Sequence, residues 1–337
     1  MRWLLLVLTL GLSGCGQLGY MSQSLGGHLR LISAAKPVDD WLAQPDLKPA
    51  LRERLILSQR LRDFAVQALQ LPDNRSYRRY ADLQRPAAVW NVAATGALDL
   101  HLKTWCFPVM GCVGYRGYFE AAQAEAFTAE LRTNEVDVYV YPVPAYSTLG
   151  WTSDPLLNTF INWPEGQLAR MIFHELAHQV AYAKDDTAFN EAYATAVERL
   201  GSAQWLSGDA HAAARAALAR TDERNARWQA LTAAARGELA ALYASSRSKD
   251  EKLAGKARIL TALRTEGTAL GFDPAWLAGL NNASLAMQAA YNDLVPAFEA
   301  LFARLGSDWV RFHAEVQRLA VLPAPERRAA LQNGALP

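Results

Sequence analysis

The chain has 337 residues, with 34 lysines and arginines against 33 aspartates and glutamates and a formal net charge of +1. This balance excludes the strong field by which basic proteins attract nucleic acid, so we expect no nucleic-acid partner. Apolar residues make up 51 % of the chain and aromatic residues 10 %, which argues against disorder and predicts a large buried core.

The first residues have the pattern of an export signal. Arg2 is followed by an apolar run over residues 3–12, which is too short to span a bilayer as a mature helix. The LSGC at residues 12–15 resembles the bacterial lipoprotein box, which implies that residues 1–14 are removed and that Cys15 carries lipid. A glycine follows the cysteine where an aspartate would imply inner-membrane retention, so we expect the outer membrane, facing the periplasm. An uncleaved anchor or a chance LSGC is the alternative.

Helical and strand patterns alternate in the first half of the chain. Apolar residues at helical spacing predict a helix over residues 51–69. Short β-prone pieces separated by glycines predict strands between about residues 86 and 118, and helix-forming residues return over residues 119–131. Residues 136–141 (VDVYVY) predict a strand that the following Pro142 ends.

Cys106 and Cys112 remain as a pair once Cys15 is assigned to lipid. An exported chain lies in a compartment where disulfides persist, so we expect a bond between these two cysteines. A metal site is the weaker alternative, because the spacing is not CxxC and no histidine lies close by in the sequence.

From residue 165 to the end the sequence is rich in alanine and other helix formers. We find no repeat and no clear linker, which favours one domain over residues 15–337. The predicted fold class is α+β with helices dominant. A small sheet in a part covering about residues 15–164 would precede two site-bearing helices and a helical lobe over about residues 165–337.

The segment HELAH at residues 174–178 carries the strongest signal in the chain. Positions four apart on an α-helix lie about 40° apart around the axis, so His174 and His178 share a face. Two imidazoles presented in this way can occupy two corners of a tetrahedral zinc site. Glu175 lies about 100° away, where it can reach a metal-bound water without binding the metal. The pattern therefore predicts a single Zn²⁺ site with Glu175 as general base.

A second helix, predicted from about Phe189 to Leu200 and ended by Gly201, supplies further candidates. A short loop at residues 184–187 would bring Glu191 back over the histidines as a third ligand, leaving a fourth position open. We expect Glu198 or Thr195 to hold a ligand histidine by its second ring nitrogen, and Asn190 to lie beside the ligands. A solvated glutamate is the alternative for Glu198.

The segments AYSTLGWTSDPLLNTF, HELAHQ and DDTAFNEAYATAVERLG resemble a bacterial family of lipoprotein zinc aminopeptidases with HExxH followed by NExxA. CFPVMGCVGYRGYF and LNNASLAMQAAYNDLVPAF extend the resemblance over most of the mature chain. It implies a membrane-tethered gluzincin-type peptidase with His174, His178 and Glu191 on zinc. Large zinc aminopeptidases hold the free amine of the substrate with a GxMEN-like segment. This chain has no such segment, so the substrate class stays open.

Peptide hydrolysis at zinc also needs a hydrogen-bond donor to the developing oxyanion. Tyr146 and Tyr291 are candidates for this donor, and structural packing or a surface position is the alternative for each. Residues 146–151 are a candidate edge strand for substrate or a plain turn. The leading hypothesis is a zinc peptidase, preferentially an aminopeptidase, acting on peptides. The alternative is a non-catalytic envelope lipoprotein that binds peptides or proteins and keeps a structural metal. A third reading has histidines that serve only the core.

Overall fold

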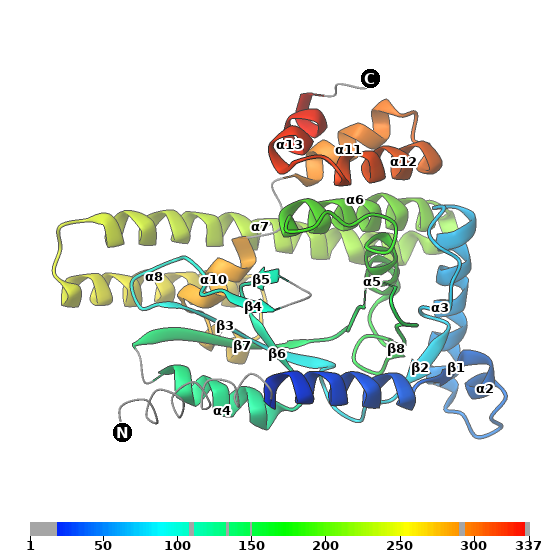
Figure 1. Ribbon diagram of the computed structural model, residues 1–337, viewed down its shortest axis with the longest axis horizontal. Coiled ribbons are helices and arrows are strands. Elements are labelled where there is room, and N and C mark those ends of the chain that lie inside the picture. Colours follow the sequence, from blue (N-terminus) through cyan, green and yellow to red (C-terminus); the bar gives the residue numbers. More distant parts are fainter. Residues whose placement is uncertain (1–18, 108–110, 133–134, 149, 290–293, 334–337) are drawn as a thin grey trace, which may run out of the picture.

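The computed structural model describes residues 19–107, 111–132, 135–148, 150–289 and 294–333 (Figure 1). Helices dominate and the sheets are small, which confirms the predicted α+β class. The helices of the first half cover residues 19–34, α2 (Val38–Leu42), α3 (Pro49–Gln67) and α4 (Ala121–Arg132). The later helices are α5 (Glu165–Ala177), α6 (Thr187–Trp205), α7 (Ala212–Ala244), α8 (Lys249–Ala269), α9 (Pro274–Ala278), α10 (Asn282–Ala289), α11 (Val295–Arg304), α12 (Trp309–Ala320) and α13 (Ala324–Asn333).

Every described strand precedes α5 in the sequence. The first sheet has the order β1 (Lys36–Pro37), β2 (Arg79–Ala81), β8 (Leu156–Leu157). The second has the order β6 (Arg116–Tyr118), β3 (Val89–Gly96), β7 (Val136–Val143), and the third pairs β4 (Trp105–Phe107) with β5 (Gly111–Val113). The predicted strand at residues 136–141 is present, but it continues through Pro142. A proline fits there because β7 is an edge strand, whose outer N–H groups have no ladder partner to lose.

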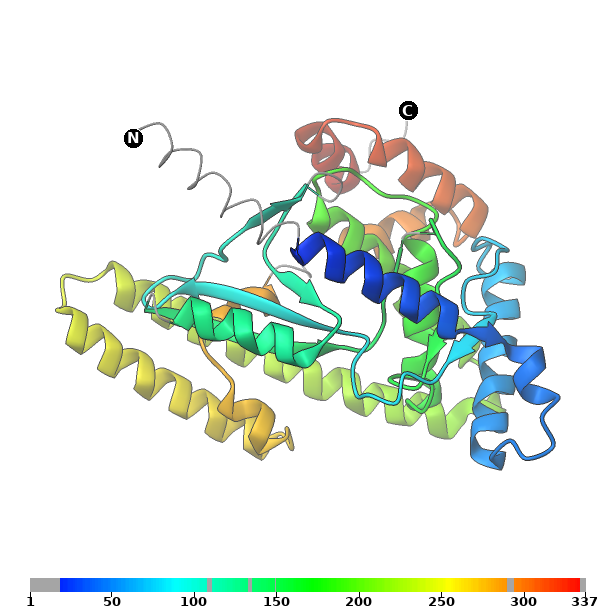
Figure 2. The ribbon, with the colours of Figure 1, turned by 60° about the horizontal axis from the view of Figure 1, so that its bottom comes forward.

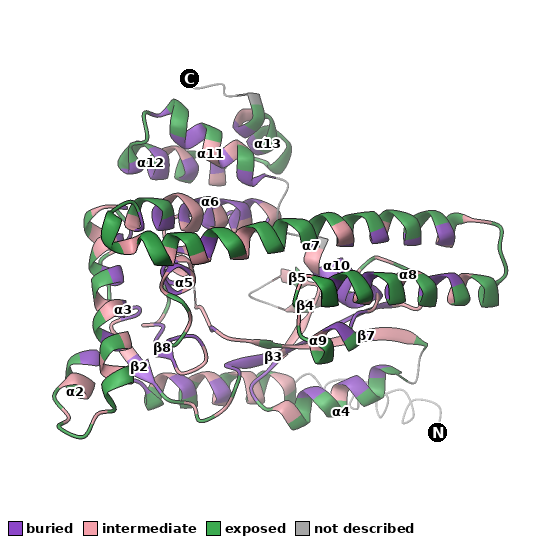
Figure 3. Cartoon of the chain, turned by 180° about the vertical axis from the view of Figure 1, so that it is seen from behind, coloured by how far each residue is buried: buried purple, intermediate pink, exposed green. Residues whose placement is uncertain are grey.

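The helices after α6 do not form one lobe. Figure 2 shows α7 and α8 as a long antiparallel hairpin that extends away from α5 and α6. In Figure 1, α11, α12 and α13 lie together on the other side of α6. The largest core joins α3, α5, α6, α11 and α12, and a separate core lies between α7, α8, α9 and α10. Figure 3 shows the exposed residues along the outer face of α7 and the buried ones on α6 and β3.

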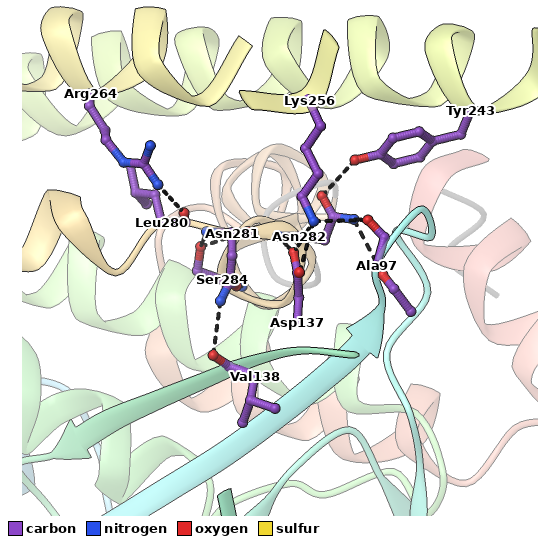
Figure 4. Close-up of polar contacts among 11 residues, drawn as sticks. Ala97, Asp137, Val138, Tyr243, Lys256, Arg264, Leu280, Asn281, Asn282 and Ser284 are labelled. Atoms are coloured by element: carbon purple, nitrogen blue, oxygen red, sulfur yellow. Dashed lines mark hydrogen bonds and ion pairs between the residues drawn. The ribbon is translucent and has the colours of Figure 1, made fainter. Parts of the chain in front are cut away.

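A buried polar cluster fastens the α7–α8 hairpin and α10 to the second sheet (Figure 4). Lys256 Nζ lies 2.6 and 2.8 Å from the two carboxylate oxygens of Asp137 and donates to the Ala97 carbonyl at 2.8 Å. The Asn282 N–H donates to the same carboxylate at 2.8 Å, and the Tyr243 hydroxyl donates to Asn282 Oδ1 at 2.9 Å. Each polar group in this cluster has a partner, so it stabilises the arrangement of the helices.

The predicted disulfide is present: Cys106 and Cys112 are bonded across β4 and β5. Cys15 lies outside the described residues, as does the predicted signal segment. None of the helices that the structure describes is both long enough and apolar enough to cross a membrane.

Candidate metal centre

The HELAH segment lies at the end of α5, and α6 packs directly against it. Leu176 and Phe173 are fully buried, so the apolar face of α5 is anchored in the core and the polar face is left for the site. The prediction that Gly201 ends the second helix is wrong, because α6 continues to Trp205. A Cβ at Gly201 would meet Leu69 Cδ1 at 2.6 Å, so this glycine allows close packing and does not act as a stop.

Side chains order the turn between α5 and α6. Asp186 caps α6 by accepting from the Phe189 N–H at 3.1 Å, and its other oxygen lies 2.6 Å from Arg327 Nη1 of α13. Asn190 accepts from the Ala183 N–H at 2.7 Å and donates to the Ala183 carbonyl at 2.8 Å. The Asn190 amide therefore holds the turn. We had expected it beside the ligands, but its hydrogen bonds are to the Ala183 backbone.

Three predicted ligands converge from the two helices. The Nε2 atoms of His174 and His178 lie 3.1 Å apart. The Glu191 carboxylate lies 3.4 Å from the first of them and 3.8 Å from the second. Zinc bonds of about 2.0–2.2 Å at tetrahedral angles would put the donor atoms about 3.3 Å apart. The spacing of the three side chains therefore fits one metal ion.

The charges of these groups also suit a cation. Burial and the neighbouring His174 lower the pKa of His178 to about 4, so its lone pair is available at neutral pH. Burial raises the pKa of Glu191, but the His174 hydrogen bond and the electrostatic interactions with the two histidines outweigh it, so the pKa of this carboxyl group is lowered. Burial opposes charge on His174, yet the carboxylates of Glu191 and Glu198 hold its pKa well above the usual range. A metal would displace the proton held between this histidine and the Glu191 carboxylate.

Glu198 of α6 supplies the contact that metal-binding histidines usually have. Its Oε2 lies 2.9 Å from His174 Nδ1, which places the proton on Nδ1 and turns Nε2 toward Glu191. Thr195 is half-buried and forms no hydrogen bond to either histidine in the described part of the chain. His178 Nδ1 is buried without a hydrogen-bond partner among the described residues.

Glu175 lies outside the group of three ligands. Burial raises the pKa of its carboxyl group, and the charge of His174 and a hydrogen bond from Ser147 act in the opposite direction. Ser147 belongs to a loop ordered by Asp154, whose carboxylate accepts from the Thr148 N–H at 3.0 Å and the Thr148 hydroxyl at 2.7 Å. Glu175 is therefore a carboxylate outside the group of three ligands, next to His174 in the sequence and hydrogen-bonded by Ser147.

Of the two candidate tyrosines, Tyr146 is the one that the structure describes. Residues 144–148 form no strand, and the Tyr146 ring packs 5.2 Å from Phe119 and 5.6 Å from His28. Tyr146 therefore belongs to an aromatic cluster. Tyr291 lies outside the described residues.

Two further tyrosines, Tyr115 and Tyr77, are influenced by the charges of the site carboxylates, although no sequence pattern indicated them. Burial and the charges of Glu191 and Glu175 raise the pKa of Tyr115, between β5 and β6, to about 12. Burial and the charge of Glu175 likewise raise the pKa of Tyr77 well above its usual range. Neither residue stands in a periodic pattern, and both lie far from these carboxylates in the sequence. No local sequence signal marks them.

A cavity of about 380 Å³ opens beside the ligands between α5, α6 and α7. Met171, His174 and Glu175 line it from α5, and Thr221 and Arg224 line it from α7. Of the three candidate ligands only His174 lines this cavity, together with Glu175 and Glu198.

Helices α5 and α6 therefore bring together three side chains that could hold a metal ion. Residues 19–331 match the protein family described as "Putative aminopeptidase". The match covers most of the chain, so the chain belongs to this aminopeptidase family, which supports a peptidase. No curated protein and no solved structure matches the chain.

Proposed function

We propose that this protein is a gluzincin-type zinc aminopeptidase that hydrolyses peptides in the bacterial cell envelope. One observation carries the proposal: His174, His178 and Glu191 form a three-donor group, and Glu175 stands beside it as a fourth, separate carboxylate. A structural zinc site takes four protein ligands and has no use for such a carboxylate. The family assignment favours an aminopeptidase among the peptidases.

His174, His178 and Glu191 would hold the metal, and Glu198 would fix the orientation of His174. When bound, zinc would polarise the scissile carbonyl and make a water molecule acidic near neutral pH. Glu175 would accept the proton of the attacking water and pass it to the leaving amine. Burial raises the pKa of Glu175, and a carboxylate of raised pKa is better matched to this two-way proton transfer.

The test separates metal binding from catalysis. Glu175→Gln keeps the shape of the side chain and does not remove a ligand, so zinc content should stay near one per chain. Activity should fall at least ~100-fold, the lower end of what general acid-base catalysis contributes. His174→Ala, by contrast, should lose zinc. Exposed Glu53→Gln on α3 is the matched control and should keep both properties.

A zinc-loaded Glu175→Gln protein that cleaves peptides at the wild-type rate would refute the mechanism. Peptides with free and blocked amino termini should be compared in the same assay. Cleavage restricted to free-amine peptides is expected of an aminopeptidase, and equal cleavage of blocked peptides would assign an endopeptidase instead. A protein that binds peptides without cleaving them would support the non-catalytic alternative.

We also propose that lipid on Cys15 holds the protein at the outer membrane. The proposal is supported by the LSGC sequence and the apolar run that precedes it. Cys15→Ser, expressed behind a signal that is still cleaved, should release the protein from membranes. Retention of this cleaved variant on membranes in high salt would overturn the proposal.

A further inference from the structure

The first helix, residues 19–34, carries an apolar stripe on its outer face. Met21, Leu25 and Leu29 follow one another at intervals of four, so they lie within an arc of about 80° around the helix axis. They are 49 %, 62 % and 58 % exposed. Three of the eight large apolar side chains that are exposed in the described chain therefore lie on this one face. Single exposed apolar residues are ordinary, whereas a contiguous group points to an interaction surface.

The opposite side of this helix is packed against the rest of the protein. Leu31 is buried in the largest core, and a Cβ at Gly27 would meet the Phe119 ring at 2.1 Å. Gln23 donates to the Gly117 carbonyl at 3.2 Å and accepts from the Phe119 N–H at 3.3 Å. Figure 2 shows the helix (dark blue) on the near side of the molecule, with no other described element in front of it. The stripe is thus held outward and cannot turn into the core.

The face that carries the stripe is free of charge. Residues 19–34 contain no aspartate or glutamate, and Arg30 is their one lysine or arginine. Arg30 lies about 100° from Leu29 around the axis, outside the stripe. Its Nη2 lies 3.2 Å from Glu120 Oε1, in an ion pair whose two side chains are mostly exposed. The stripe can therefore enter an apolar surrounding without burying a charge.

The position of this helix in the sequence indicates which apolar surrounding it meets. Gly19, the first described residue of the helix, lies four residues after Cys15. A chain spans at most about 3.6 Å per residue, so Gly19 lies within about 14 Å of Cys15 whatever the conformation of the residues between them. Lipid on Cys15 would hold that cysteine at the membrane surface. The start of the helix would then lie within the same distance of the bilayer.

We propose that the stripe of Met21, Leu25 and Leu29 lies in the surface of the bilayer, so that the first helix lies flat on the membrane beside its lipid anchor. This inference rests on the proposed lipid anchor at Cys15. Because the helix is fixed to the body of the protein, the contact sets the orientation of the whole molecule on the membrane. Three side chains are too few to hold the protein without lipid, so the release expected for Cys15→Ser is unchanged.

Cysteine labels along the stripe test the inference in the lipidated mature protein. The native cysteines are not labelled, because Cys15 carries lipid and Cys106 is bonded to Cys112. Met21→Cys and Leu29→Cys, each carrying an environment-sensitive fluorophore, are compared on vesicles of phosphatidylethanolamine and phosphatidylglycerol. Brominated acyl chains should quench both labels about twofold or more, because the apolar face of such a helix lies roughly 5–10 Å into the headgroup and acyl boundary.

Val321→Cys is the matched control. Val321 follows α12 and is 83 % exposed, and Figure 1 shows α12 on the opposite side of the molecule from the first helix. Its label should therefore fluoresce as it does in water, with and without brominated lipid. Quenching at Val321 as strong as that along the stripe would show that the protein has no fixed orientation and would overturn the inference.

The two labels on the stripe distinguish a helix that lies flat from one that only hangs by its start, because Met21 and Leu29 are about 12 Å apart along the axis. Quenching at Met21 without quenching at Leu29 would overturn the inference. Labels that are shielded from water but not quenched by brominated lipid would place a second copy or another protein on the stripe, which would also overturn it.

Mass spectrometry of the amino-terminal peptide separates this inference from the proposal on which it rests. A Cys15 without lipid would refute the anchor and the inference together. A lipidated protein whose Met21→Cys and Leu29→Cys labels remain in water would refute the inference alone.

Discussion

Glu198 Oε2 lies 2.9 Å from His174 Nδ1, so α6 supplies both the Glu191 carboxylate and the group that orients a neighbouring histidine. Glu198→Gln should keep the fold and lower zinc affinity by about 10- to 100-fold, the usual effect of losing such an outer contact. Competition with a chromophoric chelator measures this. An affinity within twofold of the wild type would show that Glu198 does not support His174.

The disulfide should stabilise the protein through the short loop that it closes. Replacement of Cys106 and Cys112 by serine should lower the free energy of unfolding by about 2 kcal/mol, the chain-entropy value for so short a loop. Denaturant titration of the oxidised wild type and the double variant provides the comparison. A reductant should destabilise the wild type and leave the double variant unchanged. Equal stability of the two proteins without reductant would contradict this expectation.

Breaking the buried ion pair between Lys256 and Asp137 should be costly. The two side chains are only 11 % and 16 % exposed, and Lys256→Met would leave the carboxylate and the Ala97 carbonyl without their cation. We expect a loss of about 3 kcal/mol in denaturant titration, with zinc content unchanged. The exposed pair of Lys249 and Glu135 is the control, because Lys249→Met should have little effect. A similarly small effect at Lys256 would argue against the role of the cluster in Figure 4.

Stability should fall in mild acid because of His313. This buried ring accepts from the Tyr193 hydroxyl at 2.8 Å and donates to the Leu69 carbonyl at the same distance. Burial lowers its pKa, so the unfolded chain binds the proton more readily than the folded protein. The contribution of the neutral His313 ring to folding stability is complete above about pH 6.5, the pKa of histidine in the unfolded chain. It is lost as the pH falls through the lower pKa that His313 has in the folded protein.

Unfolding free energies measured from pH 7 to pH 5 should therefore decline less steeply for His313→Gln than for the wild type. Parallel slopes for the two proteins would assign the acid sensitivity to other groups. The variant should be less stable than the wild type at pH 7, because glutamine cannot satisfy both contacts of the imidazole.

Local patterns in the sequence predicted the elements that carry the ligands. Helical spacing alone places His174 and His178 on one face, and a short loop is enough to return Glu191 toward them. The strand at residues 136–141 was predicted for the same reason, since its β-branched and aromatic residues are contiguous. These features depend on residues that are close together in the chain.

Contacts between distant segments could not be predicted in this way. The turn at Tyr77 contains a left-handed residue and is bound to the end of α5 through Gln179, and neither property has a sequence signature. The end of α6 was mispredicted because the sequence does not distinguish a glycine that permits close helix packing from a glycine that ends a helix. Gly201 serves the contact, and only the position of Leu69 reveals it.

The ion pair of Asp186 and Arg327 joins residues that are 141 positions apart in the chain. Asp186 also caps α6, the helix that carries Glu191. Arg327 of α13 therefore forms an ion pair with the residue that caps α6. During synthesis the HELAH segment and Glu191 are made well before Arg327, which pairs with the Asp186 cap of α6. A chain that stops before α13 would contain the three candidate ligands but would leave the buried Asp186 carboxylate without its Arg327 partner.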